Sequence, residues 1–244
     1  MAIRFAEYRI AMLPDLRIYD HLLRFPLFQG LSRSELLQMA GNTKFGFLKM
    51  EAGKTLFREG SVCNQLYFLV SGVLSQSTQS DDHGYTVVEQ LVAPWLIQPE
   101  VLFGVSTRFS SSVSTLEECH FITLSKDEVM RLLDDFLIIR LNLLNIYSTL
   151  SQRRRHLQWR RTPQTLCERI VRFFLDHSAY PAGEKDFHIL MRRLASEVND
   201  SRLNVSEQLN AMQAEGLLQL HRGRIVIPSL ERLIMSVESS ANRQ

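Results

Sequence analysis

The stretch LASEVNDSRLNVSEQLNAMQAEGLL, residues 194–218, has the spacing of two short helices separated by a tight corner. In its second half, Val205, Leu209 and Met212 step by four and three, which gives a helix one buried stripe. The polar corner NDS supplies side chains that can cap the second helix, and Gly216 suits the position just beyond its end. The pattern therefore predicts a helix, a corner and a second helix with one apolar face.

A two-stranded hairpin is expected directly after these helices. The segment LLQLHRGRIVIP, residues 217–228, has the pattern of a strand, a glycine turn and a strand. Two short helices followed by such a hairpin describe a winged helix-turn-helix, whose second helix enters the DNA major groove. A helical hairpin that binds nothing fits the same spacing, so the pattern alone leaves both interpretations open.

Charge is unevenly distributed along the 244 residues, whose formal net charge is +2. Residues 1–151 hold 13 Lys/Arg and 16 Asp/Glu, whereas residues 152–224 hold 13 and 8. The basic excess thus falls on the segment that contains the two helices, which favours a polyanion partner there. The apolar share of 45% and the charged share of 22% are ordinary for a globular chain.

The segment from about Phe45 to Leu124 is rich in short strands, because apolar residues alternate with a period of two between glycine-containing turns. We expect an antiparallel β unit of about 80 residues, of the rolled kind that often encloses a small molecule. Helices are expected in the first thirty residues, after the capping residue Ser32 and after Ser125. The predicted fold class is α+β.

A long helix without Gly or Pro is predicted from residue 136 onward. Apolar residues recur along it at heptad spacing, which is typical of a helix that pairs with a second copy. The residues expected in this dimer interface are Ile139, Leu143, Ile146, Leu150 and Leu157. A second apolar face carries Leu137, Leu141 and Leu144, so that one face can meet the chain's own sheet and the other a partner chain.

Pro163 interrupts the helical pattern and marks the expected domain boundary and hinge. It lacks a backbone donor and disfavours helix at Thr162. We expect residues 1–135 to form the β-roll with its flanking helices and residues 136–162 the dimerisation helix and hinge. Residues 163–244 would then form the winged helix-turn-helix.

The segments GKTLFREGSVCNQLYFLVSGVL and RLASEVNDSRLNVSEQLNAMQAEGLLQLHRGRIVI resemble the CRP/FNR family of bacterial transcription regulators. The similarity spans roughly residues 20–235 and follows the family's order of β-roll sensor, dimer helix and C-terminal DNA reader. It implies a cyclic-nucleotide-binding-like roll and a cytoplasmic homodimer that binds a palindromic DNA site with half-sites about one helical turn apart. A regulator of this kind contacts RNA polymerase if it is an activator.

The resemblance places Arg202 on a position that contacts DNA, with Ser201 and Asn204 beside it. The expected DNA-binding residues are Ser201, Arg202, Asn204, Ser206, Glu207 and Asn210. Phosphate contacts are expected from Arg192, Arg193, Arg222 and Arg224. Family members often have an acidic residue where this chain has Leu203, and Arg where it has Glu207, so we do not expect the usual half-site sequence.

The roll departs from the pattern of family members that bind cyclic nucleotides. In those members Gly-Glu precedes Arg-Ser or Arg-Thr, and the Glu holds ribose hydroxyls while the Arg holds the phosphate. In LIQPEVLFGVSTRFSSSV, residues 96–113, Gln98 and Pro99 occupy the glycine site and Phe109 follows Arg108. The expected effector pocket contains Glu100 and Arg108, which would hold another anion or pair with each other.

Cyclic AMP is not the expected effector for a further reason. Arg154 and Arg155 stand on the long helix where cyclic-nucleotide-binding members have small hydroxyl residues. No other cofactor is indicated by the sequence, and the identity of the effector is left open.

No metal or iron–sulfur site is expected, because Cys63, Cys119 and Cys167 stand apart without a C-x-x-C pair or an N-terminal cluster. Scattered thiols of this kind suit a reducing compartment. His83 and His120 lie in the roll, where a lone histidine is more simply explained as a turn or surface residue than as a haem ligand.

Neither a signal peptide nor a membrane span is expected, because the longest apolar run, LVAPWLI, is far shorter than the roughly 20 residues that cross a bilayer. A cupin-type metalloenzyme would need two histidines and a carboxylate that converge, but the histidines are scattered and no H-x-H pair occurs. No G-x-S-x-G elbow or P-loop appears, so an enzyme is not expected. A ligand-binding or protein-interaction module with a degenerate DNA reader remains the alternative, because Glu207 replaces a basic residue.

Overall fold

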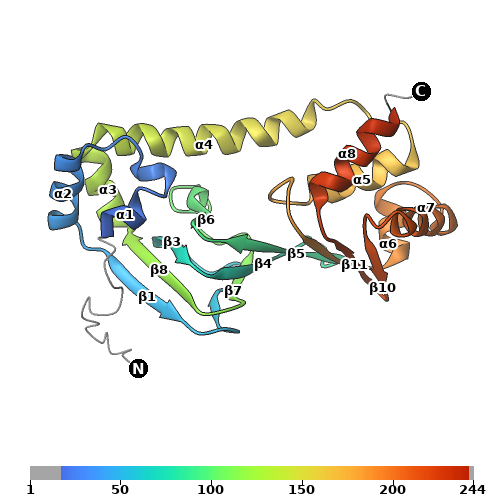
Figure 1. Ribbon diagram of the computed structural model, residues 1–244, viewed down its shortest axis with the longest axis horizontal. Coiled ribbons are helices and arrows are strands. Elements are labelled where there is room, and N and C mark those ends of the chain that lie inside the picture. Colours follow the sequence, from blue (N-terminus) through green and yellow to red (C-terminus); the bar gives the residue numbers. More distant parts are fainter. Residues whose placement is uncertain (1–17, 242–244) are drawn as a thin grey trace.

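The computed structural model describes residues 18–241, without the side chains of residues 19, 40, 157, 158 and 238–241. A β-rich N-terminal domain and a smaller C-terminal domain are linked along one side by a long helix, α4 (Figure 1). The helices are α1 (Ile18–Leu22), η1 (Pro26–Phe28), α2 (Arg33–Asn42), η2 (Pro99–Val101), α3 (Lys126–Asp135), α4 (Leu137–Gln158), α5 (Leu166–Asp176), α6 (Met191–Glu197), α7 (Arg202–Ala214) and α8 (Leu230–Ala241). The strands are β1 (Gly46–Met50), β2 (Thr55–Phe57), β3 (Gln65–Ser71), β4 (Val73–Gln79), β5 (Tyr85–Val92), β6 (Trp95–Ile97), β7 (Ser112–Thr115), β8 (Cys119–Ser125), β9 (Lys185–Ile189), β10 (Gln219–His221) and β11 (Arg224–Ile227). The predicted α+β class is confirmed.

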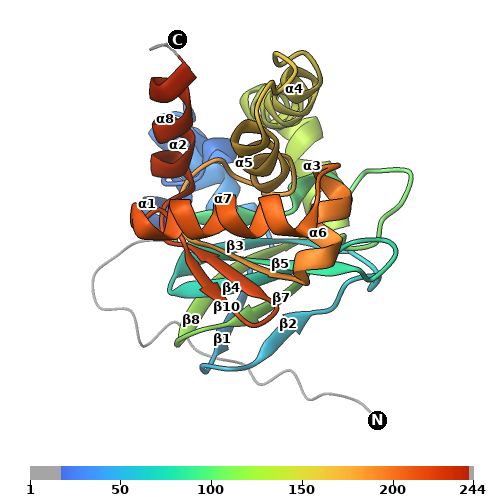
Figure 2. The same ribbon diagram turned by 90° about the vertical axis from the view of Figure 1, so that its right-hand side faces the viewer.

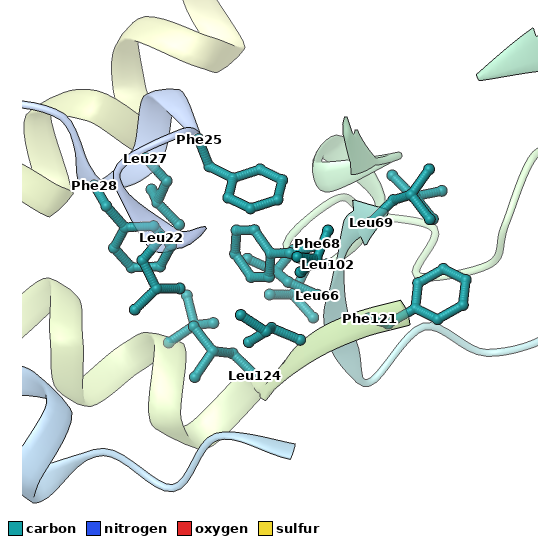
Figure 3. Close-up of a cluster of buried hydrophobic side chains, with 14 of the residues drawn as sticks. Leu22, Phe25, Leu27, Phe28, Leu66, Phe68, Leu69, Leu102, Phe121 and Leu124 are labelled. Atoms are coloured by element: carbon teal, nitrogen blue, oxygen red, sulfur yellow. The ribbon is translucent and has the colours of Figure 1, made fainter. Parts of the chain in front are cut away.

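The N-terminal domain contains the predicted antiparallel β unit. Strands β1, β8, β3 and β6 form one sheet in that order, and β5, β4, β7 and β2 are consecutive neighbours in a second. Side chains of β3, β8, α4 and the N-terminal helices form its core, which Figure 3 shows around Phe68. Phe68 packs edge-on against Phe25, with their ring centroids 5.1 Å apart. This core holds the roll and one face of α4 together as one body.

The predicted helix starts in this domain are confirmed where the structure describes them. The Ser32 hydroxyl accepts a hydrogen bond from the Glu35 N–H at 3.3 Å, and the Glu35 carboxylate accepts one from the Ser32 N–H at 2.8 Å. The Ser125 hydroxyl accepts from the Glu128 N–H at 3.2 Å at the start of α3. Of the helix expected in the first thirty residues, the structure shows the short α1 and η1, and residues 1–17 lie outside the described chain.

The face of α4 that was expected to form a dimer interface packs on the same chain instead. Ile139 and Leu143 are buried in the core of the N-terminal domain, and Ile146 packs against that core. The expectation is wrong for these residues, because heptad spacing indicates an apolar face but not which surface covers it. Leu150 lies on the lining of a cavity, and the Leu157 side chain lies outside the described set.

The other apolar face of α4 is open to solvent. Leu137, Leu141 and Leu144 expose 62%, 53% and 56% of their surface. These three residues form the second apolar face that the sequence predicts, and that face is not covered within the described part of the chain.

The C-terminal domain has the helices and hairpin that the sequence predicts. Val205, Leu209 and Met212 of α7 are buried in a core that they share with α5, α6 and α8. Strands β10 and β11 pair as an antiparallel hairpin, and Gly223 in its turn has a φ of +73°. A residue with a side chain rarely adopts this φ, so the glycine is required for the tight turn.

One sheet runs through both domains, which the sequence did not indicate. Strand β5 pairs with β4 on one edge and with β9 of the C-terminal domain on the other. Strand β9 in turn pairs with β11, so that the hairpin extends the sheet of the roll (Figures 1 and 2). The two domains are therefore joined by backbone hydrogen bonds as well as by the α4–α5 connection.

None of the described helices combines the length and the apolar character needed to span a membrane.

Candidate nucleic-acid interface and effector cavity

Side-chain hydrogen bonds hold the corner between α6 and α7. The Ser201 hydroxyl accepts from the Asn204 N–H at 3.1 Å, which makes Ser201 the N-cap of α7. The Asp200 carboxylate accepts from the Ser201 N–H and the Asn204 side-chain amide, both at 2.8 Å, and forms an ion pair with Arg169 of α5. The Asn204 bond, the Ser201 bond and the Arg169 charge lower the pKa of Asp200, the first of these most. The start of α7 is therefore fixed relative to α5 and α6.

The outer face of α7 presents the residues that were expected to contact DNA. Ser201, Arg202, Asn204, Glu207 and Asn210 are exposed, and Ser206 is half-buried. In Figure 2, α7 lies at the front of the molecule, with the strands of the N-terminal domain behind it. Leu203, Glu207 and Asn210 lie on the side of α7 away from its buried stripe, and Arg202 lies in its first turn.

Two features distinguish this surface from a uniformly basic one. Leu203, next to Arg202, is 67% exposed, and Glu207 lies one turn further along the same helix. The Asn210 side-chain amide donates to the Ser206 carbonyl oxygen at 2.8 Å, so part of its hydrogen-bonding capacity is used within the helix. Arg202 has no ion-pair partner among residues 18–241 and is free to reach a ligand.

Two of the four arginines expected at phosphates are held by acidic residues. Arg224 donates to both carboxylate oxygens of Asp186, at 2.9 and 3.0 Å, and this pair raises the pKa of the guanidinium. Arg193 pairs with Asp82 at 2.7 Å and with Glu197 at 2.5 Å. Neighbouring carboxylates therefore compete with phosphates for the donors of these two arginines, whose contact with DNA stays a prediction.

Arg192 and Arg222 remain accessible for such contacts. Arg192 lies in the first turn of α6, and Arg222 lies in the turn of the β10–β11 hairpin. Both are exposed and have no ion-pair partner within the described part of the chain. Arg192 lies on α6, which precedes α7 in the chain, and Arg222 lies in the hairpin that follows α7. Both are therefore candidates for contacts with DNA phosphates beside α7.

A cavity of about 580 Å³ lies between the two domains and α4. Its volume falls in the usual range for small-molecule sites. The lining residues include Glu89, Trp95, Gln98 and Glu100 from the N-terminal domain, Arg153 and Arg154 from α4, and Tyr180 from the α5–β9 connection. Glu100 is predicted at this site from the sequence, whereas the residues of the α5–β9 connection are not, because they come from a distant part of the chain.

Glu100 and Arg108 are not brought together as expected. The Arg108 guanidinium is exposed and donates to the Gly60 carbonyl oxygen at 2.7 Å, and Arg108 does not line the cavity. The cation nearest to Glu100 comes instead from α4, where Arg154 lies 4.0 Å from the carboxylate. The arginine of the roll therefore lies outside the cavity, and an arginine of the long helix lies on its lining.

Gln98 occupies the position where cyclic-nucleotide-binding relatives have glycine. Its φ is +41°, a left-handed conformation that glycine adopts without strain. Its side-chain amide donates to the Ser111 hydroxyl at 2.7 Å, and its carbonyl oxygen accepts from the Ser110 N–H at 3.1 Å. The loop thus has a left-handed residue at this position, and the glutamine side chain lies in the wall of the cavity.

Tyr180 connects the cavity wall of the C-terminal domain to the other two walls. Its ring packs edge-on against Trp95, with centroids 4.5 Å apart, and the Arg153 guanidinium lies 5.9 Å from its centroid. Burial raises the pKa of Tyr180. Nearby, Tyr147 donates to the Pro99 carbonyl oxygen at 2.9 Å, and burial raises the pKa of Tyr147 to about 12. Both hydroxyls are therefore neutral donors near neutral pH.

Cysteine and histidine side chains do not gather into a metal site among residues 18–241. Cys63 and Cys119 are buried and Cys167 is half-buried, and burial raises the pKa of each thiol. His83 has a φ of +56° in the β4–β5 turn, and His120 lies 3.2 Å from the Glu118 carboxylate on the surface.

The two domains match two domain families, in the order in which the fold contains them. Residues 47–136 match the cyclic nucleotide-binding domain, and residues 168–235 match the Crp-like helix-turn-helix domain. The chain belongs to the CRP/FNR family of bacterial transcription regulators. This CRP/FNR protein is thus a transcription regulator with a DNA-binding helix-turn-helix formed by α6 and α7, and it is not an enzyme.

Solved structures with some similarity to this CRP/FNR regulator include the catabolite activator protein of Thermus thermophilus. That protein is 20% identical over 87% of this chain and 98% of its own, with a TM-score of 0.43. DNR from Pseudomonas aeruginosa is 18% identical over 89% and 96%, with a TM-score of 0.44. A crp/fnr-family regulator from Eubacterium rectale is 18% identical over 86% and 97%, with a TM-score of 0.47. Because these scores lie below 0.5, the family membership depends on the two domain models.

A comparison with curated proteins gave no match.

Proposed function

We propose that this CRP/FNR regulator binds a palindromic DNA site as a homodimer and discriminates its sequence with the outer face of α7. The observation that carries this proposal is the placement of Arg202. Its side chain is exposed in the first turn of α7, over a stripe of buried residues that fixes the helix. Arginine in this place can donate two hydrogen bonds to a guanine edge, and Ser201 and Asn204 can contact the adjacent backbone.

We infer that the homodimer forms through the exposed face of α4. Leu137, Leu141 and Leu144 step by four and three, so they form one continuous apolar stripe. Parallel self-association along this stripe would bury it and place the two α7 helices at the same end of the dimer. In this proposal the chain has three units: the sensor domain of residues 1–135, the dimerisation helix and hinge of residues 136–162, and the DNA-binding domain of residues 163–244. Contact with RNA polymerase is expected if the regulator is an activator.

The cavity between the domains is the proposed effector site. Its side chains do not fit a cyclic nucleotide held in the family's manner, because Arg108 lies outside the cavity and Gln98 fills the glycine position. Arg153 and Arg154 on α4 offer cationic donors, and Trp95 and Tyr180 offer aromatic surface. An effector that contacts these groups would favour one arrangement of the two domains over another, which is a shift in populations.

A second candidate function is a ligand-binding or interaction module whose DNA reader is degenerate. The observation that favours it is the pair Leu203 and Glu207, which put an apolar and an acidic side chain on the face of α7 that would meet DNA. Such a module would bind DNA without sequence preference or not at all.

Selection of bound sites from random duplex DNA distinguishes the two functions. The purified full-length protein is expected to enrich one palindromic sequence, with half-sites about one helical turn apart. Enrichment of no sequence, at a salt concentration where the protein still binds DNA, would support the degenerate reader. Repeating the selection with small molecules from a cell extract tests whether occupation of the cavity changes the enrichment.

A further inference from the structure

The two domains of this regulator are joined by a continuous strand pairing, which we call the junction. Residues 85–89 of β5 pair antiparallel with residues 185–189 of β9, from Tyr85 opposite Ile189 to Glu89 opposite Lys185. Because β4 occupies the other edge of β5, the DNA-reading domain is an extension of the sheet of the roll. Pairing of this kind orients two domains far more strictly than a flexible connection of the length of residues 159–165.

A buried ion pair lies at one end of the junction. The Lys185 ammonium is 2.9 Å from the Glu89 carboxylate, and each side chain is only 3% exposed. The Glu89 carboxylate also accepts from the Ala179 N–H, at 3.0 and 3.1 Å. While the domains stay joined, removal of either group would leave the other charge buried without a partner, so the junction requires both residues or neither.

The other end of the junction is held by the turn between β4 and β5. Asp82 in this turn pairs with Arg193 of α6 at 2.7 Å, and the Arg193 guanidinium lies 5.9 Å from the centre of the Tyr85 ring. The Tyr85 ring packs edge-on against Phe173 of α5 and against His177 directly after α5, with centroids 5.4 and 5.3 Å away. Contacts of the roll with α5, α6 and β9 thus surround the side of the reader that faces the N-terminal domain.

A residue of the roll also completes the core of the reader. Val87 of β5 is buried among the apolar side chains of the C-terminal domain, opposite Phe187. The reader therefore has part of its core supplied by the other domain, which is unusual for two domains that move independently.

The junction leaves the DNA-reading face free. Arg193 of α6 pairs with Asp82 of the roll, whereas its neighbour Arg192 is exposed, and Arg202, Leu203 and Glu207 of α7 are exposed at the front of the view in Figure 2. The contacts of the roll and the residues expected at DNA are therefore on different sides of the helix-turn-helix, and a joined reader can still approach a duplex.

We propose that the junction holds the reader in its DNA-competent position relative to α4. This inference rests on the proposed function, namely binding of a palindromic site by two readers. When both readers are fixed to the dimer helix, binding of the first places the second at its half-site with a high effective concentration. A C-terminal domain whose junction is broken should bind a single half-site as well as the joined domain does, but the dimer loses this advantage for the full site.

A disulfide across the junction tests the proposal in one direction. Thr86 and His188 lie directly opposite each other in the paired strands, on the face away from Val87, so a cysteine pair there is in disulfide reach. In Thr86→Cys/His188→Cys, oxidation is expected to form the cross-link and to leave affinity for the selected full operator within about threefold of that of the reduced protein. The two single variants control for the three native thiols.

A released variant tests it in the other direction. Val87→Asp places a charge in the junction without changing the sequence of the reader, and Val92→Asp makes the same change at an exposed position of the same strand beyond the junction. In Val87→Asp, the preference for the full operator over a half-site duplex is expected to fall by about tenfold or more. Affinity for the half-site duplex should be retained, and Val92→Asp should behave like the parent protein.

A milder pair of variants covers the case in which Val87→Asp unfolds the reader and abolishes half-site binding. Asp82→Asn removes the carboxylate of the roll that pairs with Arg193 and leaves Glu197 of α6 as its partner, and Asp81→Asn makes the same charge change at a residue with no ion pair among the described residues. Only Asp82→Asn is expected to lower the preference for the full operator.

Three outcomes would overturn the inference. The cross-link fails to form, the cross-linked protein loses operator binding that reduction restores, or both Val87→Asp and Asp82→Asn keep the parent's preference for the full operator. If the parent protein itself has no sequence preference, the proposed function fails and the cross-linking result alone decides whether the strands pair in solution.

Discussion

Lys185 of the C-terminal domain and Glu89 of the N-terminal domain form an ion pair with an N–O distance of 2.9 Å. Each side chain is only 3% exposed, and α4 lies between the two residues in the sequence. Because burial removes both groups from water, loss of one partner leaves the other charge uncompensated. We expect Glu89→Ala to lower the free energy of unfolding by about 3–5 kcal/mol, the usual effect of breaking a buried pair. Urea denaturation followed by circular dichroism measures this change.

The matched control is the surface pair of Lys49 and Glu118, whose side chains are more than half exposed at a distance of 3.0 Å. Glu118→Ala should leave stability nearly unchanged, because exposed pairs contribute little. The double variant Glu89→Leu/Lys185→Met, which removes both charges, should recover most of the stability lost in Glu89→Ala. Equal stability of Glu89→Ala and the parent protein would contradict the role assigned to the pair.

Charged residues on the open face of α4 should separate the subunits. In Leu141→Glu/Leu144→Glu, each dimer would bring four carboxylates into its interface, so we expect a folded monomer with weakened binding to the full operator. Sedimentation velocity measures the oligomeric state. Met130→Glu, at an exposed apolar residue of α3, is the control and should remain dimeric. A dimeric double variant would show that another surface joins the chains.

The pH dependence of stability should depend on Asp200 at the corner of the helix-turn-helix. Its folded pKa is lowered from 3.8 by hydrogen bonds from Asn204 and Ser201 and by Arg169. A lowered carboxyl pKa stabilises the fold fully above the unfolded value, and this contribution is lost as the pH falls through the folded value. Asp200→Asn should therefore be less stable than the parent protein near neutral pH, and the difference in thermal midpoint should vanish in strong acid. A difference that persists unchanged in acid would exclude the carboxylate as its cause.

Arg222 in the wing should act on affinity and not on selectivity. We expect Arg222→Ala to weaken binding to the operator and to unrelated DNA by similar factors, and to lower the slope of log affinity against log salt by about one. Fluorescence anisotropy over a series of salt concentrations measures both quantities. Arg224→Ala is the comparison, because the Asp186 carboxylate already holds its guanidinium, and a smaller change of slope is expected for it.

Local sequence patterns were sufficient to predict the helices of the helix-turn-helix. They were not sufficient to predict which surface packs against each apolar helix face. The spacing of Val205, Leu209 and Met212 predicted the buried stripe of α7, because helix periodicity is a property of neighbouring residues. The same periodicity located both apolar faces of α4 but assigned Ile139 and Leu143 to a partner chain, since the pattern carries no information about what covers a face.

Contacts between distant segments were the part that could not be predicted. Strands β5 and β9 are far apart in the sequence, with α4 and the connection to the C-terminal domain between them. Neither strand has a sequence pattern that predicts which strand it pairs with. The ion pairs of Asp82 with Arg193 and of Asp186 with Arg224 also join residues that are distant in the sequence, so the local pattern did not predict them. The same holds for Arg108, which lies outside the cavity that Glu100 lines. A basic residue on a helix or hairpin is therefore a candidate phosphate contact only until its acidic neighbours in space are known.

The selectivity of Arg202→Ala tests the central claim most directly. The measurement is the ratio of the dissociation constant for a scrambled duplex to that for the selected operator, at one salt concentration, for the parent protein and the variant. If Arg202 of α7 contacts base edges, the substitution should reduce this ratio by an amount equivalent to about 1–3 kcal/mol. A ratio that is the same for both proteins, with affinity lowered equally for both duplexes, would contradict sequence discrimination by this face of α7.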